Sequence, residues 1–211
     1  NSNAFTGKVG DDAVAAVTGG VATALGFPAA RVFSSSTGVI GEPLPHDRIT
    51  ARIPDLVAGL SGEGIAMAAK AIMTTDTFPK GASAEVAGEG GPIRIAGIAK
   101  GSGMIAPDMA TMLVYIFTDA KIPAATLQKM VSRNVGATFN SITVDSDTST
   151  SDTLLVAATG QSPAAEVKGA VARSFEKALA GVMHDLALQV VRDGEGVTKL
   201  VEVRVTGAAS D

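Results

Sequence analysis

The residues best suited to chemistry form few recognisable constellations. The chain has two histidines, His46 and His184, and no cysteine. Neither histidine lies in a Gly-x-Ser-x-Gly or His-Glu-x-x-His setting, so the parts of a Ser-His-Asp triad and of a zinc protease are missing. Without cysteine there is no thiolate nucleophile, disulfide or Cys-ligated metal. The commonest histidine-based and cysteine-based sites are therefore excluded.

Two further patterns resemble binding loops only weakly. Asp145, Asp147 and Asp152 are spaced somewhat like calcium ligands, but the Gly and the final Glu of a calcium loop are absent. We expect a solvated turn there. The glycine-rich residues 88–91 and 101–103 lack the Lys-Ser/Thr pair of a phosphate loop and are typical of turns between strands.

Two loop segments carry the remaining candidates. Residues 34–38 are small polar residues ending in Gly38, which favour an exposed turn whose free amides could bind an anion. An ordinary polar turn is the alternative. Residues 100–113, taken alone, are a loop that leads into a strand.

Apolar periodicity predicts the elements that must position these loops. Helical spacing after Asp, Pro or Ser predicts helices, and alternation beside glycine turns predicts strands. The expected helices are residues 11–25, one opened by Pro54, one capped by Ser61 that continues through Ile72, 123–135 and 163–191. The expected strands are residues 31–34, a hairpin of 84–87 and 93–98, the buried run 112–117, 142–144, 154–157 and 201–205.

These elements mix strands and helices without regular βαβ spacing. We therefore expect an α+β fold of layered mixed sheets with flanking helices rather than a doubly wound sheet. We find no internal repeat and no low-complexity linker in the sequence.

The composition and net charge exclude some classes of binding partner. The 211 residues are 46% hydrophobic and 18% charged, which indicates a globular chain with an aliphatic core. A net charge of -4 argues against nucleic acid and anionic membranes as partners. No apolar run reaches the roughly 18 residues that span a bilayer, and the polar start at Asn1 is no signal peptide. We expect a cytoplasmic protein.

Four segments together carry a family resemblance, namely residues 35–41, 73–77, 100–113 and 143–150. They resemble the ornithine acetyltransferase family of arginine biosynthesis, the bifunctional glutamate N-acetyltransferases. Residues 1–7 and 192–196 extend the similarity over nearly the whole chain, although the N- and C-terminal ends of the family have no counterpart here. The resemblance implies a self-cleaving enzyme with a fold like that of N-terminal-nucleophile proteins.

The resemblance also implies a cut between Ala110 and Thr111. Residues 1–110 would match the first (α) subunit, and residues 111–211 would match the start of the second (β) subunit. Thr111 would be the nucleophile, and its new terminal amine, with a pKa of about 7.7 to 8.0, would be the general base. Thr37 and Gly38 match the oxyanion-hole pair of the family, which would stabilise a tetrahedral intermediate.

Thr77, Lys100 and Glu195 match substrate-binding positions of the family, as does Thr111 itself. Lys100 and Thr77 would hold carboxylate or polar groups of the amino acid, and Glu195 would face its amine. Outside this motif context, Lys100 and Glu195 would be read as ordinary surface residues, since Lys and Glu are rarely buried unpaired.

The implied activity is transfer of an acetyl group from N-acetylornithine to glutamate through an acetyl-Thr111 intermediate. It needs no metal or organic cofactor, although some family members also accept acetyl-CoA as donor. Two alternatives are a self-cleaving hydrolase such as a β-aminopeptidase-like enzyme, in which water accepts the acyl group, and a non-catalytic fragment. The family further suggests a heterotetramer of two cleaved α/β pairs.

Overall fold

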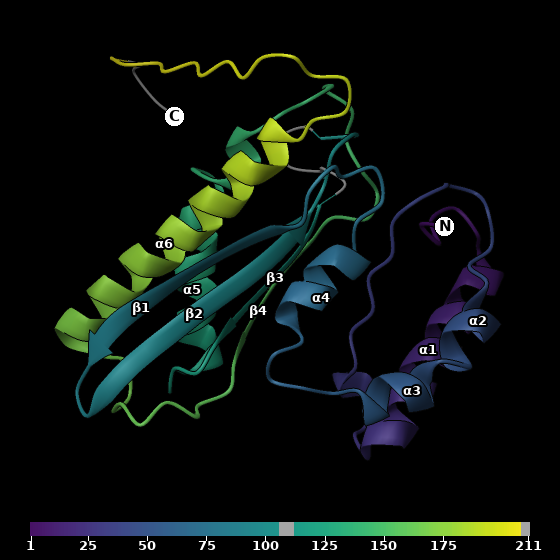
Figure 1. Cartoon of the computed structure of the whole chain (residues 1–211), viewed down its shortest axis with the longest axis horizontal. Coiled ribbons are helices and arrows are strands. Elements are labelled where there is room, and N and C mark those ends of the chain that lie inside the picture. Colours follow the sequence, from purple (N-terminus) through teal and green to yellow (C-terminus); the bar gives the residue numbers. More distant parts are fainter. Residues whose placement is uncertain (106–111, 208–211) are drawn as a thin grey trace.

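A four-stranded mixed sheet with the order β1-β2-β3-β4 forms the centre of the fold (Figure 1). The computed structural model describes residues 1–105 and 112–207. Strands β1 (Lys80–Gly88) and β2 (Gly91–Lys100) form an antiparallel hairpin, as the sequence predicts, and β3 (Leu113–Thr118) pairs antiparallel with β2. Strand β4 (Thr153–Ala158) is parallel to β3.

The connection from β3 to β4 contains helix α5 (Ala124–Val135), which begins one residue after the predicted start at Pro123. A parallel pair needs such a crossover, because the chain must return to the same end of the sheet before the second strand begins. The predicted α+β class with a mixed sheet and flanking helices is confirmed.

The long helix α6 (Gly169–Arg192) packs against β1 and β2 (Figure 1). Its apolar face is fully buried, and Phe175, Leu179, Met183 and Leu186 all have 0% exposure. Gly97 of β2 allows this close approach, since a Cβ there would lie 2.9 Å from side-chain atoms of both Ile116 and Leu186. The core therefore lies between the sheet and the layer formed by α6 and α5.

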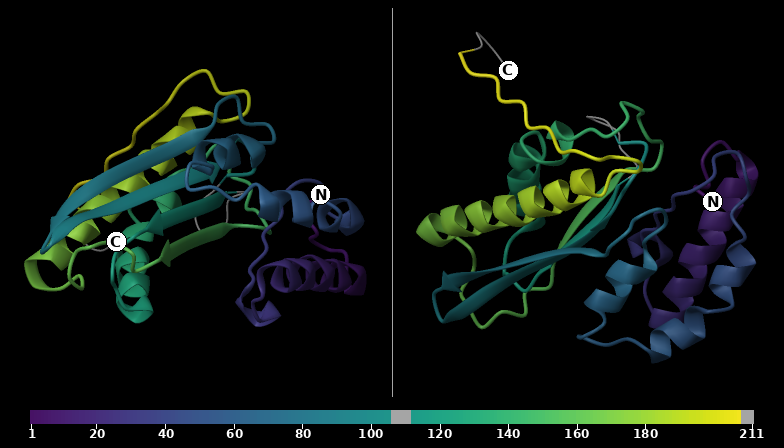
Figure 2. Two further views of the ribbon diagram at one scale, coloured as in Figure 1. Left: turned by 60° about the horizontal axis from the view of Figure 1, so that its bottom comes forward. Right: turned by 45° about the horizontal axis from the view of Figure 1, so that its top comes forward.

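Four further helices precede the sheet. They are α1 (Lys8–Leu25), α2 (His46–Thr50), α3 (Ile53–Ala58) and α4 (Ile65–Ala71). Helix α4 packs against β1 and β2, while α1 contacts α2 and α3 in a group beside the sheet (Figure 2). Short 3₁₀ turns occur at Ala29–Arg31 and Phe139–Ser141.

Several predicted boundaries are wrong. Helix α1 begins at Lys8 rather than residue 11, because the carbonyl of Gly7 accepts the amides of Gly10 and Asp11 and extends the first turn. Helix α4 begins at Ile65, although the Ser61 hydroxyl does accept the Glu63 amide at 3.1 Å. Helix α6 begins at Gly169 rather than 163, because the amides of Ala165 and Val167 bind distant carbonyls instead of helical ones.

Three predicted strands are also wrong. Residues 31–34 begin with the end of a 3₁₀ turn and continue without a ladder. Residues 142–144 are not a strand, although the amide of Val144 binds the carbonyl of Ile105 at 2.8 Å. Residues 201–205 have no ladder in the described part of the chain, and their three valines are 75 to 81% exposed.

Within residues 1–105 and 112–207, no helix is both long and apolar enough to cross a membrane.

Candidate active site

A buried carboxylate, Asp76, holds together two chain segments at the end of β2. Its side chain accepts hydrogen bonds from the amide of Gly101 at 2.8 Å and from the amide of Thr74 at 3.1 Å. It also accepts one from the ammonium of Lys80 at 2.6 Å. Burial raises the pKa of Asp76, but these hydrogen bonds outweigh it and hold the pKa below its usual value. Asp76 thus fixes residues 74–77 against the start of the loop that follows Lys100.

Lys80, at the start of β1, is the centre of a buried ion network. It has 0% exposure, and its Nζ lies 2.6 Å from Asp76 Oδ1 and 2.6 Å from Asp193 Oδ2. The ammonium also lies 4.8 Å from the centroid of the Phe78 ring. Taking a charge out of water costs several kcal/mol unless it is paired and hydrogen-bonded. Two carboxylates meet that condition here.

Asp193 follows the last residue of α6 and connects this helix to the network. Its carboxylate accepts the amide of Thr77 at 2.9 Å as well as the hydroxyl of Thr77. Its own carbonyl accepts the hydroxyl of Ser102 at 2.7 Å. Asp193 therefore joins three segments that are far apart in the sequence.

Lys100, the last residue of β2, is buried but only partly neutralised. Its Nζ donates to the Thr74 hydroxyl at 2.6 Å and lies 3.7 Å from Asp76 Oδ2, a carboxylate that Lys80 already engages. Burial lowers the pKa of Lys100, Asp76 raises it in part, and the nearby charge of Lys80 lowers it further. An ammonium has three donors, so Lys100 can also bind a carboxylate from a ligand.

Glu195 is exposed and lies beside the loop after Lys100. Its amide donates to the carbonyl of Ser102 at 2.6 Å. A Cβ at Gly103 would lie 2.9 Å from Glu195 Oε2, which places the carboxylate against this glycine. The structure therefore gathers the segments that carry Thr77, Lys100 and Glu195 at one end of the sheet.

The loop after Lys100 is anchored on both sides. Asp145 accepts the amides of Met104 at 2.5 Å and Ile105 at 2.9 Å. Met104 has a left-handed backbone with φ of 56°, which a non-glycine residue seldom adopts. Asp152 accepts the amide of Met112 at 3.0 Å. Asp152 is exposed, but partial desolvation by the surrounding chain raises its pKa to about 6 despite this hydrogen bond. The predicted cleavage pair Ala110 and Thr111 lies outside the described residues.

Thr37 and Gly38 lie in a different setting. Residues 36–41 run beside the N-terminal residues, where the amide of Ser2 binds the carbonyl of Val39 at 3.0 Å. Gly38 has φ of 133°, and a Cβ there would lie 3.1 Å from the backbone nitrogen of Asn1. In the part of the chain that the structure describes, no hydrogen bond joins Thr37 or Gly38 to the segments of Thr77, Lys100 and Glu195, and their role as an oxyanion hole stays a prediction.

The turn before Thr37 nevertheless reaches the sheet. The Ser35 hydroxyl is hydrogen-bonded to the Tyr115 hydroxyl of β3. A cavity of about 440 Å³ lies at this contact, between α1 and the strands β3 and β4. Its lining residues include Val14, Ser35, Ser36, Tyr115 and Leu154.

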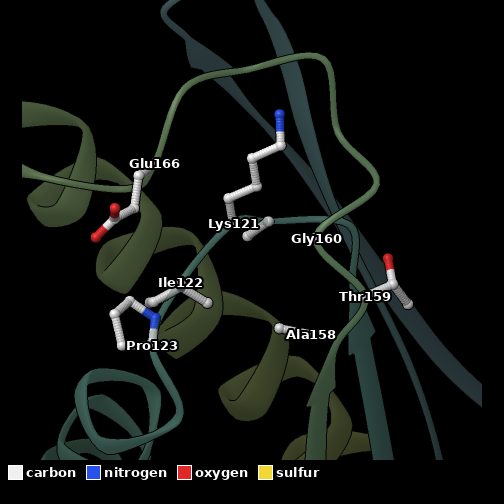
Figure 3. A pocket seen from close by; sticks show the side chains of 8 residues that line it. Lys121, Ile122, Pro123, Ala158, Thr159, Gly160 and Glu166 are labelled. Carbon is white, nitrogen blue, oxygen red and sulfur yellow. The ribbon is translucent and has the colours of Figure 1, made fainter.

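A second cavity, of about 380 Å³, lies at the opposite end of β3 and β4 (Figure 3). Lys121 and Glu166 line it, but their charged groups point away from each other. None of the predicted site residues lines it. Among the described residues there is also no group of three or more His, Cys, Asp or Glu side chains placed to hold a metal ion.

Comparison with known proteins matches the whole chain to one family. The ArgJ family model covers residues 1–211. This chain belongs to the ArgJ family. A relative from Ruegeria pomeroyi is 63% identical over 211 residues, which are 100% of this chain and 51% of the relative. Relatives from Gluconobacter oxydans and Brucella suis are 54% and 52% identical, again over 100% of this chain and 50% and 52% of the relative.

Each of these three relatives bears the name "Arginine biosynthesis bifunctional protein ArgJ". The chain spans about half the length of the curated relatives that it matches. Membership of the ArgJ family confirms the resemblance that the sequence motifs indicate.

Sequence reasoning misses the residues that connect the segments of the predicted site. Asp76, Lys80 and Asp193 lie next to or within the motifs, but the motifs assign them no role. One of their contacts has a sequence signal. Lys80 lies four residues after Asp76, and a Lys at that spacing can form an ion pair with the Asp. The spacing of Asp145 and Asp152 resembles that of calcium ligands, whereas in the structure these carboxylates accept backbone amides that flank the predicted cleavage loop.

Proposed function

We propose that this chain is part of an acyltransferase that moves an acetyl group from N-acetylornithine to glutamate through an acetyl-Thr111 intermediate. The observation that carries the proposal is that the segments of Thr77, Lys100 and Glu195 are hydrogen-bonded to one another's neighbours at the end of β2, just before the predicted cleavage loop. The names of the relatives support a role in arginine biosynthesis.

The charges at this end of the sheet suit an amino-acid substrate. Lys100 supplies a buried cation with spare donors for a carboxylate. Glu195 supplies an anion for an ammonium group, and its exposure leaves it open to a ligand. A zwitterionic or dipolar substrate would satisfy both residues at once.

The reaction follows from a threonine with a free terminal amine. Cleavage between Ala110 and Thr111 provides that amine, which takes the proton of the Thr111 hydroxyl as the oxygen attacks the acetyl carbonyl. The oxyanion would be stabilised by Thr37 and Gly38. The C–N bond then breaks and ornithine leaves with the proton. The amine of glutamate attacks the acetyl ester, and N-acetylglutamate leaves as Thr111 regains its proton.

This function is tested with a polypeptide that carries the sequence at the length of its relatives. Incubation with N-acetylornithine alone should leave one acetyl group on the peptide that contains Thr111, and initial-rate plots against both substrates should give parallel lines. No acetylated peptide during turnover, together with intersecting lines, would contradict the covalent route. Free acetate in place of N-acetylglutamate when glutamate is present would instead identify a hydrolase.

A further inference from the structure

The hydroxyl of Thr77 has a single proton, and in the structure it donates this proton in a hydrogen bond to the carboxylate of Asp193. The Thr77 hydroxyl donates to Asp193 Oδ1, while the Thr77 amide donates to Asp193 Oδ2 at 2.9 Å. An ionised carboxylate has no proton of its own and can only accept hydrogen bonds. The direction of the hydroxyl bond is therefore fixed as long as Asp193 stays ionised.

The surroundings of Asp193 keep it ionised. Lys80 Nζ lies 2.6 Å from Asp193 Oδ2 and is itself fully buried. Burial raises the pKa of Asp193, but the hydrogen bonds from Lys80 and from Thr77 lower it more, and the net pKa lies below its usual value. At neutral pH the carboxylate therefore accepts a hydrogen bond from the only proton of the Thr77 hydroxyl.

We propose that Asp193 is a positioning residue that makes Thr77 a hydrogen-bond acceptor for the side-chain ammonium group of the bound amino acid. Thr77 is exposed as a residue and its hydroxyl is only part-buried, and the oxygen keeps lone pairs that can accept a further hydrogen bond. This inference rests on the proposed function. It places the carboxylate of the substrate at Lys100 and the ammonium group at Thr77 and Glu195, so Thr77 does not bind the carboxylate.

Replacing Asp193 by asparagine should reverse the direction of the hydrogen bond between the Thr77 hydroxyl and residue 193. Two donors meet at Oδ2, namely the Thr77 amide and the Lys80 ammonium, so the amide oxygen of the asparagine has to occupy that position. Its NH₂ group then faces the Thr77 hydroxyl. The hydroxyl has to accept that bond and turn its proton outward, where it opposes an ammonium group.

The experiment compares N-acetylornithine with N-acetylnorvaline, which has the same carbon chain without the ammonium group. It uses the self-cleaved full-length polypeptide that carries this sequence and measures the ratio of kcat/KM for the two donors. Thr77→Val should lower this selectivity about tenfold, and Asp193→Asn should lower it at least as much. Thr77→Ser, which keeps the acceptor, should stay within about twofold of the wild type.

Asp185→Asn is the matched control, because Asp185 is an exposed aspartate on α6, the helix that Asp193 follows. It should leave the selectivity unchanged. Retained selectivity in either Thr77→Val or Asp193→Asn would overturn the proposal. If Asp193→Asn does not fold, Thr77→Val tests the contact of Thr77 with the ammonium group, and the wild-type hydrogen-bond coupling described next decides the role of Asp193.

A ligand-free measurement separates this inference from the proposed function. NMR should detect the Thr77 hydroxyl proton with a scalar coupling across the hydrogen bond to the Asp193 carboxylate carbon, and Asp193→Asn should abolish it. A wild type that transfers no acetyl group would contradict the proposed function alone. Absence of this coupling in the wild type would overturn the proposal that the Thr77 hydroxyl donates its proton to Asp193.

Discussion

Lys80 and Asp193 lie 113 positions apart in the sequence, and their side chains form a buried ion pair of 2.6 Å. Lys80 opens the first strand, and Asp193 follows the last helix. The pair therefore brings the segment of Thr77 together with the segment of Glu195. Both segments depend on a charge that has no contact with solvent.

Lys80→Met should destabilise the protein strongly. The substitution keeps a long side chain but leaves Asp76 and Asp193 buried without their shared cation, at a cost of about 3 to 5 kcal/mol in the free energy of unfolding. Urea unfolding of the wild type and the variant measures this difference. Lys177→Met, at an exposed position on α6, should change the free energy by less than about 0.5 kcal/mol. Similar effects of the two substitutions would place Lys80 outside any buried network.

Asp152 should titrate near pH 6 rather than near 4. Partial desolvation raises its pKa to about 6, although the residue is exposed, whereas an unfolded aspartate has a pKa of about 3.9. The folded state therefore binds the proton more tightly, and stability from this group is complete below about pH 4 and lost as the pH rises through about 6. The carboxyl ¹³C shift of Asp152 measures the midpoint directly.

Asp152→Asn provides the control for this titration. It keeps an oxygen that can accept the Met112 amide but removes the ionisation. The variant should lose the part of the pH dependence of Tm that Asp152 contributes between about 4 and 6. A wild-type midpoint near 4 would show that folding does not raise the pKa of Asp152.

Self-cleavage between Ala110 and Thr111 should depend on the Thr111 hydroxyl. In a polypeptide of the length of the relatives, intact-mass measurement should find two chains, the second beginning with Thr111. Thr111→Ala should remain one uncut and inactive chain, because nucleophile and terminal base are both lost. Thr111→Ser should still cut, more slowly, since it keeps the hydroxyl but loses the methyl group that restricts its rotamer. An intact wild type that is nevertheless active would refute the mechanism.

Glu195→Gln should weaken the use of ornithine-type donors. A charged hydrogen bond contributes roughly 1.5 to 3 kcal/mol, so kcat/KM should fall about tenfold or more while Tm changes little. Gly103→Ala should act in the same direction, because its Cβ would displace the Glu195 carboxylate from a position 2.9 Å away. Gly181→Ala is the control, since nothing lies within 4 Å of a Cβ there. Unchanged kinetics in Glu195→Gln would show that Glu195 does not bind the substrate.

Local pattern was sufficient to predict elements whose stability is local. The hairpin β1–β2 combines alternating residues with a glycine turn, and helix α5 combines Pro123 with regular apolar spacing. Pattern failed where tertiary contacts decide. Residues 201–205 alternate as a strand should, but alternation gives a strand only when a partner completes the ladder, and the described residues supply none.

The site was predictable to a similar extent. The motifs predict Thr77, Lys100 and Glu195 as substrate-binding residues, and the structure gathers their segments at one end of the sheet. The partners that hold them were not predictable, because an ion pair between Lys80 and Asp193 is a long-range contact that no local spacing encodes. The roles of all these site residues, Thr37, Gly38 and Thr111 included, stay predictions from the family resemblance.

The pairing of β2 with β3 has a consequence for the two chains that the proposed self-cleavage would produce. Strand β2 precedes the bond between Ala110 and Thr111, and β3 follows it, yet six residue pairs from Ile95↔Thr118 to Lys100↔Leu113 join them. The ion pair of Lys80 with Asp193 crosses the same division. Cutting the chain would therefore leave two polypeptides that share one sheet and one core. Their separation would expose that core to water, so the cleaved halves should behave as an obligate complex that only denaturant takes apart.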